Sequence, residues 1–139
     1  MKIGIVGQGF VGSAVFEGFK KHFNVETFDL KKKSTCSNLQ ELIHKSDYIF
    51  ICLPTPMEQT GKCHTGILES VIKEINNISK GKILIVKSTI PPGTTENWNK
   101  TFKNVKIVFN PEFLTEANAL DDYKNQNRII LGGPRKANS

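Results

Sequence analysis

Short hydrophobic runs alternate with segments of helical periodicity along the whole chain. Runs that are apolar at successive positions are typical of strands buried on both faces of a parallel sheet. They predict strands over residues 2–6, 24–29, 47–53, 83–86, 105–109 and 128–131. Helical spacing of apolar residues predicts helices over 11–19, 37–45 and 68–78, with shorter ones over 93–101 and 115–120.

This alternation predicts an α/β protein: a Rossmann fold with a doubly wound parallel sheet and the strand order 3-2-1-4-5-6. At 139 residues the chain is long enough for one domain with its own core. We expect that domain to span residues 1–133, followed by a polar tail over 134–139. In such sheets ligands bind at the carboxyl ends of the strands, so the loops after the strands should carry the function.

A glycine-rich turn separates the first hydrophobic run from the first helix. It reads Gly7-Gln8-Gly9-Phe10-Val11-Gly12. Gly7 can make the tight turn, Gly9 leaves room for a pyrophosphate, and Gly12 lets the helix pack close to the strand. The helix begins with free N–H groups and the positive end of its dipole, which both favour phosphate. The pattern therefore predicts a dinucleotide site.

Asp29 ends the second predicted strand. Dinucleotide folds place an acidic residue about 20 positions beyond the glycines, where it accepts the hydroxyls of the adenosine ribose. Lys31–Lys33 follow at once. They are either a solvated turn or partners for the 2′-phosphate of NADP. Because an aspartate repels that phosphate, we expect the cofactor to be NAD.

Composition and charge restrict which classes of binding partner we expect. The net charge of +6 suits anionic ligands, but the basic residues are scattered without an Arg-rich stripe, so we expect no nucleic acid. No hydrophobic run approaches the roughly 20 residues of a membrane span, and the N-terminus lacks a signal-peptide pattern. Cys36, Cys52 and Cys63 have no C-x-x-C spacing and suggest reduced thiols. We therefore expect a cytoplasmic protein with no membrane partner and no metal site.

Three loops after predicted strands are rich in proline, hydroxyl and carboxylate groups. They are residues 53–65, 87–95 and 110–116. Their prolines restrict the backbone, which suits a preorganised site, and their polar groups could orient a polar substrate. A simpler interpretation is turn chemistry, with Thr94 or Thr115 as helix caps and Glu112 and Glu116 as surface charges.

Taken together, these segments resemble the UDP-glucose/GDP-mannose 6-dehydrogenase family, whose members oxidise a sugar C6 alcohol to a carboxylate with two NAD. The resemblance rests on the glycine turn, on Ile51-Cys52-Leu53-Pro54-Thr55-Pro56, on residues 87–95 (KSTIPPGTT), on residues 110–117 (NPEFLTEA) and on residues 127–133 (NRIILGG). These motifs follow one another in the family's order and span nearly the whole chain. Thr115 and Ala117 depart from the family pattern, which affects fine substrate contacts rather than the fold.

The resemblance implies a role for each matching residue. The cofactor-binding residues would be Gly7, Gly9, Phe10, Val11, Gly12, Asp29, Pro54, Thr55, Ser88, Thr89 and Glu116. Glu112 would act near the sugar C6 in thioester hydrolysis, and Thr89 would be the second catalytic residue. The nucleotide sugar would touch Phe113, Leu114 and Thr115.

Family members continue through a long connecting helix into a second, nucleotide-sugar-binding domain. That domain supplies the nucleophilic cysteine, a lysine and most base contacts, and no cysteine here matches that nucleophile. The chain thus resembles a cofactor half, which would be inactive alone and homodimeric in a full-length form. One alternative is a stand-alone dinucleotide-binding module without catalysis. Another is a β-hydroxyacid-dehydrogenase-like domain, against which the Asn110–Leu114 segment argues.

Overall fold

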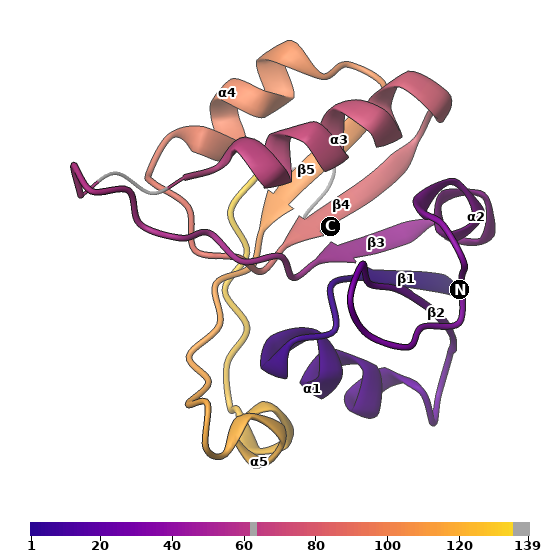
Figure 1. Cartoon of the computed structure of the whole chain (residues 1–139), viewed down its shortest axis with the longest axis vertical. Coiled ribbons are helices and arrows are strands. Elements are labelled where there is room, and N and C mark those ends of the chain that lie inside the picture. Colours follow the sequence, from indigo (N-terminus) through magenta and orange to yellow (C-terminus); the bar gives the residue numbers. More distant parts are fainter. Residues whose placement is uncertain (62–63, 135–139) are drawn as a thin grey trace.

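The computed structural model describes residues 1–61 and 64–134, which form one parallel sheet with helices on both of its faces (Figure 1). The strands are β1 (Lys2–Val6), β2 (Asn24–Phe28), β3 (Tyr48–Ile51), β4 (Lys82–Val86) and β5 (Val105–Phe109). The helices are α1 (Phe10–Phe19), α2 (Leu39–Lys45), α3 (Gly66–Ile78), α4 (Thr94–Thr101) and α5 (Ala119–Asn125). Most of the expected polar tail, residues 135–139, lies outside the described part.

The α/β Rossmann-type fold is confirmed, but the predicted strand order 3-2-1-4-5-6 is wrong. In the described residues the order is β2-β1-β3-β4-β5, all parallel. The third strand pairs with β1, where Ile49 lies beside Gly4, instead of with β2. The apolar run of β3 explains why this strand lies between β1 and β4. An interior position in the sheet allows both faces of the strand to be buried. The chain reverses direction across the sheet between β1 and β3, which makes this the switch point.

The predicted sixth strand over 128–131 is also wrong. The outer edge of β5 already has partners. Asn99 of α4 accepts from the Ile107 N–H at 2.9 Å and donates to the Ile107 carbonyl at 2.8 Å, as a neighbouring strand would. Gly132 exchanges both backbone bonds with Phe109 in a single antiparallel bridge. With these groups satisfied, residues 128–131 run past β5 without forming a ladder.

Two apolar layers hold the fold together. Helices α2, α3 and α4 pack on one face, where Leu42, Ile72 and Trp98 meet buried residues of the strands. On the other face α1 covers Ile3 and Ile5, and α5 lies against α1. Figure 1 shows the same division, with α3 and α4 on one side of the sheet and α1 and α5 on the other. The right-handed connections on either side of the switch point place helices on opposite faces.

Local signals position the helix ends with small differences from the sequence prediction. The capping box of α2 lies one residue later than the Ser37–Gln40 pair suggested: Asn38 is the N-cap and accepts from the Glu41 N–H at 2.8 Å. The last helix begins at Ala119 instead of residue 115, because Thr115 is held by Asp122 of α5 and stays outside the helix. No helix in residues 1–61 and 64–134 is long and apolar enough to cross a membrane.

Candidate dinucleotide site

The glycine turn between β1 and α1 has the geometry that the sequence led us to expect. Gly7 has φ +95°, a left-handed conformation that side chains disfavour. A Cβ on Gly12 would lie 1.9 Å from the Gly7 carbonyl oxygen, so only glycine allows α1 this close to the turn. Gly9 differs, because it has φ −69° and a Cβ there would meet nothing within 4 Å. The protein itself does not require glycine at position 9. The space beside Gly9 at the amino end of α1 is open to a ligand.

Asp29 lies directly beside this turn. Its Oδ2 accepts from the Gln8 N–H at 2.7 Å, and its Oδ1 accepts from the N–H groups of Lys31 and Lys32 at 2.7 and 2.9 Å. Burial alone raises the pKa of Asp29, but these three donors and the Lys32 charge hold that pKa below its ordinary value. The carboxylate is therefore ionised and fixed in position. It has about four lone-pair sites, so it can still accept a hydroxyl hydrogen bond from a ligand.

Lys32 adds a contact that the sequence analysis did not single out. Its ammonium donates to the Gln8 carbonyl at 2.9 Å, which joins the loop after β2 to the glycine turn. The positive charge beside the turn adds to the potential that attracts a pyrophosphate. In the sequence, the only indication of this contact is that Lys32 belongs to the run Lys31–Lys33. Such runs of charge usually form a solvated surface, so the run alone does not predict the contact.

The loops after β3 and β4 are held against each other. The Ser88 hydroxyl donates to the Leu53 carbonyl at 2.5 Å, and Ser88 is buried. Thr55 is half-buried, whereas Pro54 and Thr89 are exposed on the same two loops. Ser88 therefore has a local bond that fixes the loops, while Thr55 and Thr89 lie closer to the solvent side of this edge.

Two titratable groups at this edge of the sheet, Lys87 and Cys52, have pKa values that burial shifts. The Lys87 ammonium donates to Asn110 Oδ1 at 2.8 Å. Burial lowers the pKa of Lys87, and its interactions with Cys52 and Glu112 act in the opposite direction. Burial raises the pKa of the Cys52 thiol to about 12, although Lys87 acts against this. Cys52 is thus a neutral thiol at physiological pH and a poor nucleophile.

Cys36 is no better as a nucleophile, because burial raises the pKa of its thiol. Cys63 lies outside the described residues. In the described part of the chain, no three His, Cys, Asp or Glu side chains gather in the manner of a metal site.

The loop after β5 carries Glu112 and the residues expected to touch substrate. The Glu112 carboxylate accepts from the Leu114 N–H at 2.6 Å, which folds the loop back on itself. Thr115 donates to Asp122 Oδ2 from both its N–H and its hydroxyl, at 2.8 and 2.6 Å. Phe113 is 64 % exposed, and the Arg128 guanidinium lies 5.5 Å from the centre of its ring. Thr115 therefore fixes the start of α5, and Phe113 presents the exposed apolar surface.

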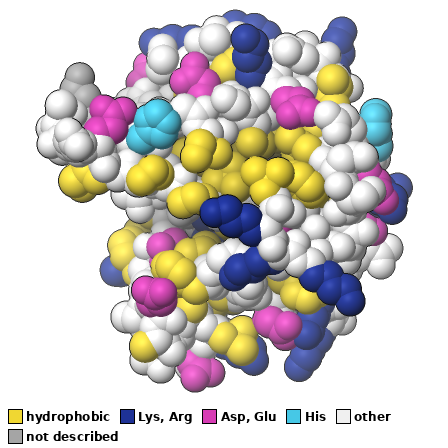
Figure 2. Space-filling view, in the orientation of Figure 1, with side chains coloured by type: hydrophobic (Ala, Val, Ile, Leu, Met, Phe, Trp, Pro, Cys, Tyr) yellow, Lys and Arg dark blue, Asp and Glu magenta, His cyan; other side chains and the backbone are white. Residues whose placement is uncertain are grey.

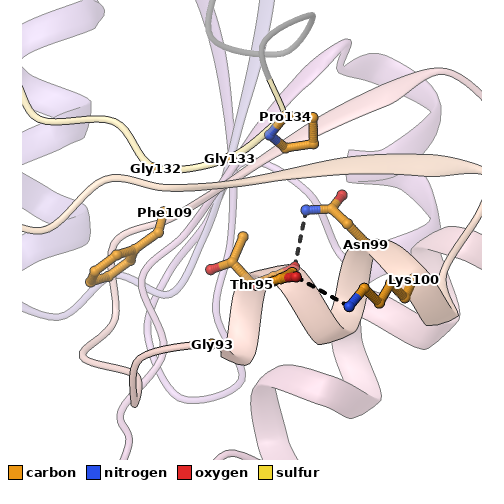
Figure 3. Close-up of a pocket in the computed structure, with 9 residues that line it drawn as sticks. Gly93, Thr95, Asn99, Lys100, Phe109, Gly132, Gly133 and Pro134 are labelled. Carbon is orange, nitrogen blue, oxygen red and sulfur yellow. Dashed lines mark hydrogen bonds and ion pairs between the residues drawn. The ribbon is translucent and has the colours of Figure 1, made fainter.

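A groove of about 350 Å³ brings two predicted cofactor residues together. It lies between α1 and the start of α5, and Phe10 and Glu116 both line it. A second hollow, of about 580 Å³, lies at the edge of β5 and away from the glycine turn. Figure 3 shows Thr95 and Asn99 of α4 on one side of it and Gly132 to Pro134 on the other. Both Asp29 and the amino end of α1 lie on the glycine-turn side of the molecule.

Hydrophobic and basic side chains lie beside each other on one face of the molecule. Figure 2 shows hydrophobic side chains gathered across the middle of one face, over the region of β3 and β4, with Lys and Arg side chains along the lower edge of the gathering.

Comparison with known proteins agrees with this geometry. Residues 24–139 match the family model for the NAD-binding domain of the UDP-glucose/GDP-mannose dehydrogenase family. The UDP-glucose 6-dehydrogenase of Campylobacter jejuni is 33% identical, over 95% of this chain and 42% of its own length. That of Streptococcus pneumoniae is 27% identical, over 95% of this chain and 41% of its own length. The chain thus spans about two fifths of the length of these relatives.

Solved structures share the fold. A GDP-mannose dehydrogenase from Pseudomonas aeruginosa, solved as a ternary complex, superimposes with a TM-score of 0.84 at 24% identity, covering 98% of this chain and 42% of that one. A UDP-glucose dehydrogenase from Pyrobaculum islandicum gives a TM-score of 0.83 at 22% identity, covering 99% and 42%. At these identities the likeness establishes the arrangement of the elements alone.

Proposed function

Because this chain belongs to the UDP-glucose/GDP-mannose dehydrogenase family as its NAD-binding domain, we propose that it supplies the cofactor half of a nucleotide-sugar 6-dehydrogenase. That activity oxidises the C6 alcohol of a nucleotide sugar to a carboxylate with two NAD. The observation that carries the cofactor assignment is Gly9, a glycine that neither backbone conformation nor packing requires. It lies at the amino end of α1 next to the fixed carboxylate of Asp29.

The residues divide the work of binding along the carboxyl edge of the sheet. The free N–H groups at Gly9, Phe10 and Val11 hold the pyrophosphate, and Asp29 accepts the adenosine ribose hydroxyls. The nicotinamide side is lined by residues of the loops after β3, β4 and β5, namely Pro54, Thr55, Ser88, Thr89 and Glu116. When bound, NAD supplies the hydride acceptor.

Glu112 and Thr89 lie on neighbouring loops at the same edge. Glu112 orients water, and Thr89 polarises the C6 oxygen through its hydroxyl. The nucleotide sugar touches Phe113, Leu114 and Thr115. Neither Cys36 nor Cys52 has an activated thiol. As the resemblance to the family implies, the nucleophile and most of the substrate contacts belong to a second domain, in a cytoplasmic protein that is homodimeric in full-length form.

Calorimetry with the chain tests the cofactor assignment. We expect NAD or NADH to bind, and to bind more tightly than NADP. Asp29→Ala should weaken NAD by about 1–3 kcal/mol, because the ribose hydroxyls lose a charged acceptor. Glu26→Ala, three residues earlier on β2, is the matched control and should leave the affinity unchanged. Tighter binding of NADP than NAD would overturn the assignment.

Activity distinguishes the enzyme half from a stand-alone binding module. The chain alone should produce no NADH from UDP-glucose. Combined with a complementary second domain from a relative, it should turn over, and Glu112→Gln should then slow the release of acid. Binding of NAD without any turnover in such a combination would favour the non-catalytic module. Turnover by the chain alone would place the nucleophile in it, and Cys63 would be the first residue to replace.

A further inference from the structure

A buried ammonium group lies at the carboxyl end of β4, and no carboxylate of the described residues forms an ion pair with it. Lys87 is only 5 % exposed, yet it forms no ion pair with a carboxylate in residues 1–61 and 64–134. Its one hydrogen-bond acceptor there is the neutral amide oxygen of Asn110, at 2.8 Å. Lysine is rarely buried without a charged partner, because removing an ammonium from water is unfavourable. A hydrophobic side chain of the same length would fill this space more easily.

The polar groups of Asn110 bond to two segments, the end of β4 and the segment that runs past β5. Its N–H donates to the Val86 carbonyl at 2.9 Å, which continues the β4–β5 pairing. Its Oδ1 accepts from Lys87, and its Nδ2 donates to the Ile130 carbonyl at 2.9 Å. An ammonium can only donate and a carbonyl can only accept, so this orientation of the amide is the one that satisfies both partners. Asn110 is therefore a bridge between the end of β4 and the segment that runs past β5.

The two segments that meet at this bridge flank the candidate site. Glu112 follows Asn110 by two residues, and its carboxylate closes the loop onto the Leu114 N–H. Arg128 lies over the Phe113 ring and ties the other segment to the same loop. The Glu112 charge also favours the charged form of Lys87.

We propose that Lys87 is a positioning residue: its buried ammonium orients Asn110, and through Asn110 it holds the Glu112 loop and the 128–131 segment at the carboxyl edge of the sheet. The consequence for catalysis rests on the proposed function. The positioning itself does not, because it is measured on the chain without cofactor.

Amide hydrogen exchange of the Asn110 and Leu114 N–H groups tests the positioning. Lys87→Met keeps the length of the side chain and removes the donor, so both amides should exchange about tenfold faster or more. Lys87→Arg keeps a donor and a charge and should restore most of the protection. Lys106→Met, an exposed lysine of β5, is the matched control and should change neither amide. Unchanged exchange in Lys87→Met would show that Lys87 only fills space.

Asn110→Asp separates the two arms of the bridge. An aspartate still accepts from Lys87, but it cannot donate to the Ile130 carbonyl. The Leu114 amide should then stay protected, while the Gly132 amide, which bonds to Phe109 further along the second segment, should exchange faster. Equal effects on both amides, or none on Gly132, would refute the bridge.

The pKa of Lys87, measured by titration, distinguishes a positioning role from mere filling of space. With ¹³C-labelled lysine, the pKa of Lys87 should fall further in Glu112→Gln, because that change removes a negative charge that favours the ammonium. Glu116→Gln, on the exposed end of the same loop, should leave it unchanged. A Lys87 pKa that does not respond to Glu112 would contradict the coupling. If wild-type protein failed to bind NAD while these results held, the proposed function would fall and the positioning would stand.

Discussion

The three glycines of one turn differ in the constraints that the protein places on them. Gly7 is needed for its positive φ, and Gly12 for its contact with the Gly7 carbonyl. Gly9 has neither constraint in the protein. The identity of a residue in a motif can thus be set by the backbone, by packing or by a ligand, and only the coordinates tell these causes apart.

Alanine at positions 9 and 12 should therefore have opposite effects on stability and binding. Gly9→Ala should change the free energy of unfolding by less than about 0.5 kcal/mol, because its methyl group enters open space. It should weaken NAD about tenfold or more, because that methyl group stands where the pyrophosphate approaches. Gly12→Ala should destabilise the fold by about 1–3 kcal/mol through its clash with the Gly7 carbonyl.

Urea unfolding and calorimetry on both variants check this pair. Gly61→Ala, in open space but with φ +81°, isolates the effect of backbone strain alone. If Gly9→Ala bound NAD as tightly as wild type, the pyrophosphate would have to lie elsewhere.

At the scale of elements, short side-chain bonds decide where helices start and where the sheet stops. Asn99 occupies the outer edge of β5, and Asn38 caps α2. Glu41 closes the same cap from the other side, since its Oε2 accepts from the N–H and the hydroxyl of Ser37, both at 2.9 Å. These bonds satisfy backbone groups that a helix start or a strand edge leaves open.

The α2 cap should make stability depend on pH in acid. The Ser37 N–H bond, then Lys45 and the Ser37 hydroxyl, lower the pKa of Glu41 from its ordinary 4.5 to about 2. Because the folded-state pKa is the lower one, the carboxylate stabilises the fold fully above about pH 4.5 and loses this contribution as the pH falls through about 2.

Glu41→Gln should lower the urea midpoint at neutral pH, and its difference from wild type should shrink toward zero near pH 2. Glu69→Gln, in the first turn of α3, reports the effect of an acidic residue at a helix start without this cap. A constant difference between Glu41→Gln and wild type across the range would mean that the carboxylate bonds do not form in solution.

At the scale of the whole molecule, the sheet leaves apolar side chains exposed on one flank. Phe113 is 64 % exposed and Ile129 is 71 % exposed, with Ile130 and Leu131 beside it in the chain. Arg128 and the Asn110–Ile130 bond hold together the two segments that carry these side chains. Exposed apolar surface of this kind favours association in water.

We expect the chain to self-associate as its concentration rises, and the double substitution Ile129→Ser with Leu131→Ser to suppress this. Leu30→Ser, which removes an apolar side chain that is 89 % exposed elsewhere, should leave the association unchanged. Sedimentation velocity over a range of concentrations measures the effect. A chain that stays monomeric throughout would instead suit a stand-alone binding module.

Sequence reasoning predicted the five observed strands, most helix positions and the tight, closely packed geometry of the glycine turn. These follow from local information: apolar runs, helical periodicity, and glycine spacing that few backbones require. The side chains of the three loops could be placed at one edge for the same reason, because parallel strands all end there.

Other features depended on which groups meet in three dimensions. The place of β3 beside β1, the loss of a sixth strand to Asn99 and Gly132, and the buried Lys87–Asn110 bond have no local signal in the chain. A hydrophobic run predicts a strand but not which strand it pairs with. A lysine in the sequence predicts a positive charge but not whether the fold buries it. By itself, then, the sequence determined the elements and the candidate chemistry. The tertiary structure decided the pairing, because a backbone edge or a buried donor must find a partner among whatever the fold brings within hydrogen-bonding distance.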